Sequence, residues 1–432
     1  MLFTLEPLQA ADGDCLLLHW GNEASPKLAV IDGGPGRTYE DELLPRLLEI
    51  RSNLRKARLD IDLSIVSHID LDHIVGIKKL FSALKKEIED SIPPNKRQIS
   101  VKRLWHNTFN DIVGDKIDGY YKTFTASFQA SVGGKPSQDV INNLAEDLVK
   151  RNAASPSEAT DIAYDIARVL AGHGEGRKLR DDHQFLFMNN ETTALNSPFR
   201  KDGTSTLITA EMTPTPASVN GLKFTILGPE EAEIKALQTS FDKYIKDNGL
   251  TAQAVLAAYA DKSVANLSSI ICIVQIGGKK ILLAGDARGD KIIEGLRNSG
   301  QLTGNGPISF DVLKVPHHGS DNNVDLVFFK TIIADTYVFS GDGKNGNPER
   351  TTLEWLVQAR AKSDKYKIVL TYSISSIDRG RKLDKKKNKK TWSQENDSLS
   401  AFFNAAKQDG YQFTVCEGAP EKIELGDEHV GY

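Results

Sequence analysis

Cysteine is scarce in this chain of 432 residues. The three cysteines, Cys15, Cys272 and Cys416, are far apart and form no C-x-x-C pair. We therefore expect neither a disulfide framework nor a thiolate zinc knuckle, and we expect a reducing compartment. The chain also lacks a run of about 18 apolar residues, and it begins with neither a basic region nor a long apolar core. These absences predict a cytoplasmic protein with no membrane span and no signal peptide.

Neither sign of charge is in large excess. Lysine and arginine total 54 against 58 aspartates and glutamates, a formal net charge of −4. Bulk charge therefore does not imply indiscriminate binding to nucleic acid, and a phosphate-binding surface would have to be local. The hydrophobic content of 40% and charged content of 26% are ordinary for a globular protein, and the length allows two domains or one large domain with an insertion.

Short apolar runs rich in β-branched residues alternate with helical patterns. Turn residues end each run, which is typical of strands. We expect strands near residues 15–20, 28–31, 61–67, 98–105, 223–227, 268–276, 280–284, 312–315, 336–340 and 367–370. Helical periodicity covers about 39–55, 76–86, 289–298, 352–362 and 395–408. This alternation predicts an α/β sandwich.

Residues 107–215 differ in character from the rest. They contain helical patterns at about 138–152 and 157–172 and few compact strands. We expect a mostly helical insertion that divides one α/β domain into an N-terminal half, 1–106, and a C-terminal half, 216–432. The insertion could shape a substrate cleft, or it could form the surface for a homodimer or another protein partner.

Four side chains that bind metals lie within one short segment, directly after the apolar run Leu63–Val66. They are His68, Asp70, Asp72 and His73. Two imidazoles and two carboxylates at the end of one strand suit one or two cations such as Zn²⁺ or Mn²⁺. Paired cations activate water, so the segment indicates hydrolysis.

Three other strand ends carry residues of the same kind. Asp286 follows the strand at 280–284, and His317 and His318 follow the strand at 312–315. Asp32 follows the strand at 28–31, and we expect it to support a ligand rather than bind the metal itself. Loops at one edge of a sandwich can converge on a single point and preorganise a metal site.

The order of five segments resembles the metallo-β-lactamase superfamily, and most closely the hydrolase domain of the competence protein ComEC and its soluble relatives. The segments are His68–His73 (H-x-D-x-D-H), Asn266–Ser269 (N-x-x-S), Leu282–Asp286 (L-L-x-G-D), Pro316–Ser320 (P-H-H-G-S) and the turn Gly341–Pro348. The resemblance covers roughly 1–105 and 220–375. It implies an αββα sandwich of two mixed sheets and a metal-dependent hydrolase.

Two asparagines depart from this pattern. Asn266 falls where the wider superfamily has its third ligand histidine, and Asn347 falls where the ComEC-like turn has histidine. An amide oxygen binds a metal more weakly than imidazole does, so of the one or two divalent ions expected, one would be loosely held or absent. Asp70 in place of histidine favours Mn²⁺ or Mg²⁺, and Zn²⁺ remains compatible.

The resemblance also implies roles for the residues. His68 and Asp70 would bind one cation, Asp72 and His73 a second, and Asp286 would bridge them or join one. His317 and His318 would be ligands or proton donors to the leaving group, and Asp72 could also orient the nucleophile. The expected metal set is His68, Asp70, Asp72, His73, Asp286 and His318, and the expected catalytic set is Asp72, His317 and His318.

One basic run stands out near the C-terminal end. Residues 379–390 carry eight positive side chains against one aspartate. The run is either a solvated mobile loop or an electrostatic clamp on a phosphodiester backbone, acting through Lys385, Lys386 and Lys387 with Trp392 as a stacking face. Ser320, Asn266 and Asn347 are further candidates for substrate contact, although Ser320 could instead cap the next helix. We interpret His106 as a satisfied, half-buried histidine rather than a ligand.

The sequence thus predicts a metal-dependent phosphodiesterase, in particular a nuclease acting on DNA or RNA. One alternative is a hydrolase of a small molecule such as a nucleotide, a phosphoester or a lactone. Another is a metal-stabilised interaction module in which Asn266 and Asn347 have weakened catalysis.

Overall fold

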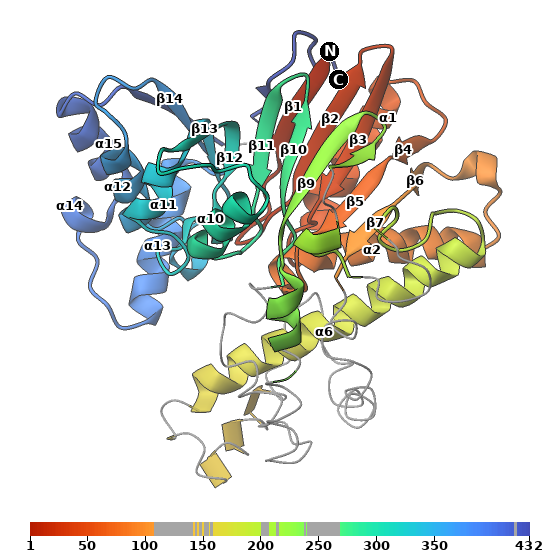
Figure 1. The fold of residues 1–432 in the computed structure, drawn as a ribbon. Helices are drawn as coiled ribbons and strands as arrows, with labels where there is room; N and C mark the ends of the chain where they lie inside the picture. The colour runs from red at the N-terminus through yellow and green to blue at the C-terminus, as the bar shows by residue number, and fades with distance from the viewer. Residues whose placement is uncertain are drawn as a thin grey trace.

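Two mixed β-sheets pack face to face, and helices cover their outer faces (Figure 1). The structure is a computed structural model. It describes residues 1–107, 141–142, 145–146, 149–150, 155, 159–199, 207–212, 216–236, 239, 268–418 and 421–432. Asn266 lies outside these residues.

The first sheet has six strands in the order β16-β1-β2-β3-β5-β7. Its strands are β1 (Leu2–Pro7), β2 (Leu16–Asn22), β3 (Ser25–Ile31), β5 (Leu63–Val66), β7 (Leu104–His106) and β16 (Ile423–Glu424). The pairs from β16 to β3 are antiparallel, whereas β3, β5 and β7 are parallel. The short strands β4 (Leu59–Ile61) and β6 (Ile99–Val101) form a separate parallel pair.

The second sheet has eight strands in the order β15-β14-β13-β12-β11-β10-β9-β8. Its strands are β8 (Ala217–Val219), β9 (Leu222–Gly228), β10 (Ile271–Ile276), β11 (Lys279–Leu283), β12 (Ile308–Lys314), β13 (Ile332–Phe339), β14 (Tyr366–Leu370) and β15 (Phe413–Glu417). The strands from β11 to β15 are parallel, so their carboxyl ends share one edge. Parallel strands buried on both faces are rich in apolar residues, as the buried carboxyl-terminal parts of β13 and β14 are.

Three buried apolar layers hold the sandwich together. The central layer, which includes Trp20, Trp105 and Phe224, lies between the two sheets. A second lies between the eight-stranded sheet and its helices, and a third between the six-stranded sheet and its helices. The helices are α1 (Leu44–Asn53), α2 (Leu71–Glu89), α6 (Ala159–Met188), α10 (Gly289–Asn298), α11 (Leu326–Thr331), α12 (Arg350–Ala359), α13 (Ile374–Lys387), α14 (Gln394–Asp397) and α15 (Leu399–Gln408).

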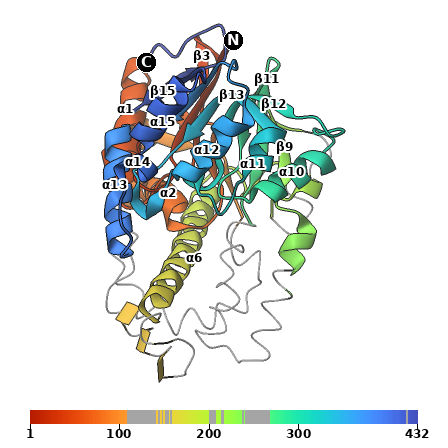
Figure 2. The same cartoon turned by 90° about the vertical axis from the view of Figure 1, so that its left-hand side faces the viewer.

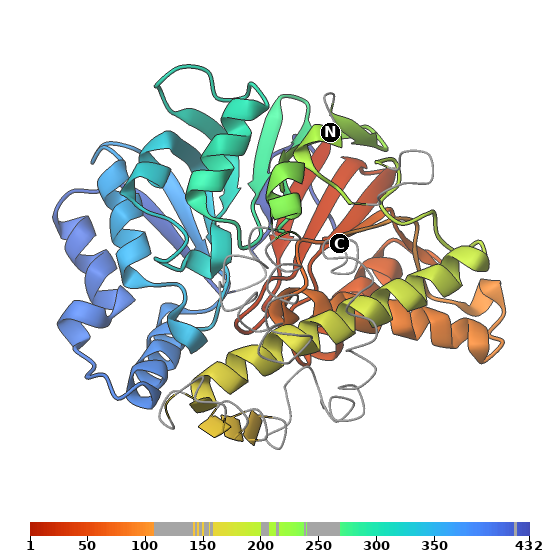
Figure 3. The same ribbon diagram turned by 60° about the horizontal axis from the view of Figure 1, so that its bottom comes forward.

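The two-sheet α/β sandwich expected from the sequence is present. The described part of the predicted insertion contains α6, which packs along α2 (Figure 3). The expected start of a helix near residue 76 is wrong, because α2 begins at Leu71. Asp72 and His73 therefore lie in its first helical turn. The last fifty residues, which the family resemblance leaves out, add the edge strands β15 and β16, one to each sheet.

Candidate metal centre

The strand ends that carry the predicted site residues meet where the two sheets face each other. β5 of the six-stranded sheet leads into Ser67 and His68, and β11 and β12 of the eight-stranded sheet lead into Asp286 and His317. The Ile270 backbone N–H donates to the Ser67 carbonyl at 2.9 Å and links the two sheets at this point. The site is thus built from both halves of the sandwich.

Asp286 is the centre of the cluster. Its carboxylate oxygens lie 3.2 Å from His73 Nε2, 3.7 Å from His68 Nε2 and 3.8 Å from His318 Nε2. His317 Nε2 also lies 3.7 Å from Asp286 Oδ2. Histidines from β5, α2 and the turn after β12 therefore converge on one buried carboxylate.

The two other predicted carboxylates lie beside the same histidines. Asp72 Oδ2 is 3.4 Å from His318 Nε2, and Asp70 Oδ2 is 3.7 Å from His68 Nε2. The Asp70 side chain is 30% exposed, so it faces the open side of the cluster. The structure thus brings together every residue of the expected metal and catalytic sets.

Several buried atoms of this cluster have no hydrogen-bond partner among the described residues. They are Nε2 of His68, His73 and His318 and Oδ1 of Asp286. A buried polar group without a partner costs about 1–3 kcal/mol, so such groups need an explanation. Each of the three Nε2 atoms lies 3.2–3.8 Å from an oxygen of Asp286, so a cation bound by this carboxylate would lie near all three rings. The group whose ligand atoms all lie within 4.8 Å of one another includes His73, Asp286 and His318 but not His68. Three imidazole nitrogens and a carboxylate oxygen fit a divalent ion such as Zn²⁺ or Mn²⁺.

The opposite sides of two histidine rings are held by hydrogen bonds. His73 Nδ1 lies 2.8 Å from Asp32 Oδ2, and His68 Nδ1 lies 3.0 Å from Ser67 Oγ. The Ser67 hydroxyl in turn donates to Asp32 Oδ2 at 2.7 Å. Fixing Nδ1 in this way directs Nε2 into the cluster, which is how supporting residues orient metal ligands. Asp32 therefore lies where a supporting carboxylate was expected.

Asp14 was missed by the sequence reading. Asp14, His73, Asp286 and His318 form a buried group, with ligand atoms within 4.8 Å of one another, that could hold a metal ion. Asp14 Oδ1 is 3.1 Å from His318 Nδ1 and accepts the Ser340 hydroxyl, and its Oδ2 pairs with Lys314 Nζ at 2.8 Å. Because both oxygens are engaged, we assign Asp14 to orienting His318. The sequence feature that could have identified Asp14 is a glycine followed by an aspartate next to an apolar strand, the same pattern as at Asp286.

The carboxylates control the charge of the histidines. Burial lowers the pKa of His318, but the Asp14 and Asp286 carboxylates outweigh burial and raise it to about 10. Burial likewise opposes the charge on His73, yet Asp286 and Asp32 raise its pKa well above the ordinary value. Burial favours a neutral Asp286, but the surrounding histidines hold its pKa well below its usual range. The cluster thus attracts positive charge strongly, as a cation site does.

Of the three polar residues predicted to contact substrate, one lies beside the cluster, one is buried in a turn and one lies outside the described residues. Asn347 Nδ2 donates to the His317 carbonyl at 3.4 Å, which places this residue beside the cluster. Ser320 is buried, and its Oγ accepts the Asn322 backbone N–H at 3.4 Å. The expectation that it caps the next helix is wrong, because Asp325 caps α11. Asn266 lies outside the described residues.

The interpretation of residues 379–390 as a mobile loop is wrong, because most of the run is helical. It forms the last part of α13, and Lys385 pairs with Asp397 at 2.5 Å. Lysine and arginine are good helix formers, and Ser373 caps the helix by accepting the Ser376 backbone N–H. Lys386 and Lys387 lie in its last turn.

His106 also differs from the expectation. It is fully buried at the end of β7, and neither ring nitrogen has a hydrogen-bond partner among the described residues. Burial lowers its pKa to about 3, so the ring is neutral. It is not part of the buried group around Asp286.

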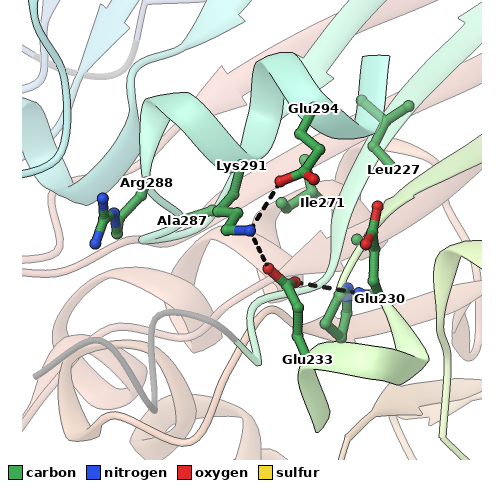
Figure 4. A pocket seen from close by; sticks show the side chains of 10 residues that line it. Leu227, Glu230, Glu233, Ile271, Ala287, Arg288, Lys291 and Glu294 are labelled. Atoms are coloured by element: carbon green, nitrogen blue, oxygen red, sulfur yellow. Dashed lines mark hydrogen bonds and ion pairs between the residues drawn. The ribbon is translucent and has the colours of Figure 1, made fainter. Parts of the chain in front are cut away.

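A small hollow lies beside the loop that carries Asp286 (Figure 4). Its volume of about 10 Å³ has room for one water molecule. Lys291 Nζ lies 2.7 Å from Glu233 and 2.8 Å from Glu294 within it. These paired charges indicate a structural ion-pair network rather than a substrate pocket.

Neither a scan against models of protein families nor a search of curated proteins finds a match for this chain. Among the helices that the structure describes, none combines the length and apolar character needed to cross a membrane. Any statement about function therefore depends on the geometry of the cluster.

Proposed function

We propose that this protein is a metal-dependent hydrolase of phosphodiester bonds with the fold of the metallo-β-lactamase superfamily. One observation carries the proposal. Nε2 atoms of three buried histidines and one oxygen of Asp286 lack hydrogen bonds within the described chain and converge where the two sheets meet. One or two divalent ions, Zn²⁺ or Mn²⁺ with Mg²⁺ also compatible, would supply Lewis acidity and an activated water there.

The two adjacent histidines have different surroundings. His318 is buried, and its ring is held by Asp14, so we assign it as a ligand. His317 has a side chain that is 31% exposed, and its Nδ1 lies 2.6 Å from Asn323 Oδ1. That contact holds the ring with Nε2 near Asp286 and open to a bound substrate. We therefore assign His317 as the proton donor to the leaving oxygen.

Asp70 and Asp72 have different exposures as well. The Asp72 side chain is 11% exposed and lies beside His318, whereas that of Asp70 is 30% exposed beside His68. In this proposal Asp72 helps to hold the cation and orients the attacking water, and Asp70 lies at the entrance of the site.

The test measures bound metal and hydrolysis together. The purified protein should contain a stoichiometric transition metal or gain one from Mn²⁺ or Zn²⁺, and it should then hydrolyse bis(p-nitrophenyl) phosphate. Chelation should lower its melting temperature, because the ligands come from both sheets and a bound ion stabilises the folded state. Asp286→Asn should lose the metal and reduce kcat/KM by more than the ~10–100-fold typical of a supporting residue.

The control is Asp290→Asn, a partly exposed carboxylate that pairs with Arg288. It should retain both metal and activity. An Asp286→Asn protein with wild-type metal content and turnover would overturn the proposal. A protein that holds metal but hydrolyses no phosphodiester would also overturn the proposal, and it would leave the small-molecule hydrolase and the non-catalytic module considered above.

A further inference from the structure

Helix α13 has two different faces. Arg379, Lys382 and Lys386 are spaced by three and four residues, so they lie on one side of the helix, and all three are exposed. We call these three residues the outer face of α13. Ile377 and Arg381 lie on the opposite side and are buried.

The cations on the inner side bind the protein itself. Arg381 Nη1 donates to the Asp397 carbonyl at 2.6 Å, and its Nε donates to the Gly346 carbonyl at 3.2 Å. Its guanidinium also lies 5.8 Å from the centre of the Trp392 ring. Together with the Lys385–Asp397 pair, these contacts hold α13 in place. Lys385 and Trp392 thus serve the fold more than a ligand.

The same helix is connected to the metal centre by the turn at residues 341–347. A Cβ on Gly343 would lie 2.1 Å from the Ile377 carbonyl oxygen, and one on Gly380 would lie 2.4 Å from the Asp342 carbonyl oxygen. α13 therefore packs backbone to backbone against this turn. At its other end the turn reaches the site, because Asn347 Nδ2 donates to the His317 carbonyl. Figure 2 shows α13 extending beyond the sheets on the same side as α6.

We propose that the outer face of α13 binds the phosphodiester backbone of a nucleic acid strand whose scissile bond lies at the metal centre. This inference rests on the proposed function and names its substrate class. The three cations of the outer face have no ion-pair partner among the described residues. Like charges at this spacing repel one another, and successive phosphates would neutralise them.

The composition of the outer face favours nucleic acid over a membrane. Leu383, which is 62% exposed, is the large apolar side chain among these cations. A helix that lies in a lipid surface needs a broad apolar face, which α13 does not present to solvent. A polymeric substrate is long enough to contact the outer face of α13 while its scissile bond lies at the metal centre.

The experiment compares two triple variants of equal charge. One is Arg379→Gln/Lys382→Gln/Lys386→Gln on the outer face. The matched control is Arg55→Gln/Lys56→Gln/Lys96→Gln, which removes the same number and kinds of cation from exposed positions near α1 and β6. Binding to labelled single-stranded DNA and RNA and to duplex DNA, each with phosphorothioate linkages that resist hydrolysis, is measured by fluorescence anisotropy with Mn²⁺ present across a salt series. Hydrolysis of bis(p-nitrophenyl) phosphate with Mn²⁺ is measured in parallel.

The outer-face variant should bind nucleic acid at least ~10-fold more weakly, and its slope of log affinity against log salt should fall by about 2 for single strands. Its hydrolysis of the small ester should be unchanged, and the control should behave as wild type in both assays. Equal nucleic acid binding by the two variants would overturn this inference while leaving the hydrolase proposal intact. Binding to anionic vesicles but not to nucleic acid would also overturn it. Failure of the wild type to hydrolyse the small ester would count against the proposed function instead.

Discussion

Asp32 shows how a single side chain can control the centre without lying in it. Its Oδ2 contacts His73 Nδ1, and its Oδ1 accepts the Ser67 backbone N–H at 2.7 Å. The carboxylate therefore fixes both the ring of one predicted ligand and the backbone just before another. Supporting carboxylates of this kind also increase the basicity of the histidine that they hold.

We expect Asp32→Asn to weaken metal binding by about 10–100-fold, because the amide has no charge and only one oxygen to accept hydrogen bonds. Isothermal titration with Zn²⁺ or Mn²⁺ measures the effect, and far-UV circular dichroism checks that the fold is retained. The control is Asp335→Asn, which lies exposed on β13. Unchanged affinity in Asp32→Asn would show that Asp32 does not support the ligand.

Asp32 and Asp14 show which site residues can be predicted from the local sequence and which cannot. Asp32 was predicted because it directly follows a recognisable strand and precedes two glycines. Asp14 depends on contacts with Lys314, His318 and Ser340, all of which lie some three hundred residues away. Local patterns contain no information about such pairs, because the fold alone brings them together.

Helix α6 lies directly over the loop that carries the first predicted ligands. A Cβ on Gly172 would come within 2.5 Å of the Ile69 carbonyl oxygen, so only glycine allows this approach. A Cβ on Gly176 would meet nothing closer than His106 Nε2 at 3.6 Å, an ordinary contact. These two glycines, one turn apart, therefore form a matched pair for testing the role of α6.

We expect Gly172→Ala to lower the free energy of unfolding by about 1–3 kcal/mol and to reduce metal affinity, because α6 or the loop at Ile69 must move. Gly176→Ala should be neutral or slightly stabilising, since alanine favours helix. Urea unfolding and metal titration of both variants make the comparison. Equal behaviour of the two would mean that α6 does not position the loop.

Element boundaries were harder to predict than the elements themselves. The start of α2 was predicted too late in the chain, because the charged and polar side chains of His68–His73 follow a strand and are typical of a loop. The basic run in α13 read as a loop for the same reason. Both helices bury part of their surface in tertiary contacts, which a local reading of charge does not include.

At the scale of the whole molecule, two buried histidines make stability depend on pH. Burial lowers the pKa of His183 to about 4, and His183 Nε2 lies 3.0 Å from the Thr193 carbonyl oxygen. Burial likewise keeps His106 neutral. An unfolded histidine titrates near pH 6.5, so below that pH the unfolded chain binds protons that the folded chain excludes. This contribution to stability is therefore present above pH 6.5 and is lost as the pH falls toward 4.

We expect the wild type to lose about 2 kcal/mol more of its unfolding free energy between pH 7.5 and 4.5 than His183→Gln does. Urea unfolding at several pH values gives the unfolding free energy of both proteins. The difference between the two values does not depend on carboxylates that both proteins share. His429→Gln, at an exposed position, should follow the wild type. Parallel pH profiles for wild type and His183→Gln would contradict the assignment of a neutral buried ring.

The places of most central strands along the chain and the convergence of their ends could be predicted from the sequence, because each predicted site residue follows an apolar run. The order of the strands within each sheet and the presence of β1 were not predicted. The helix near 395–408 was predicted, but the strands of the last fifty residues were not: β16 has only two residues, and both β15 and β16 pair with strands outside this segment. The strands that β15 and β16 pair with are those at the open edges of the two sheets, and these edges exist only once the sandwich has assembled.

This arrangement of edges has a consequence for synthesis on the ribosome. β1 lies between β2 and β16, so one of the first strands to be made receives its outer neighbour only when residues 423–424 have left the exit tunnel. Until then, the nascent chain exposes the unpaired backbone of β1, and an exposed strand edge invites pairing with other chains. Products of premature termination would therefore be prone to aggregate, and chaperones that cover open strands would act on this protein late in translation.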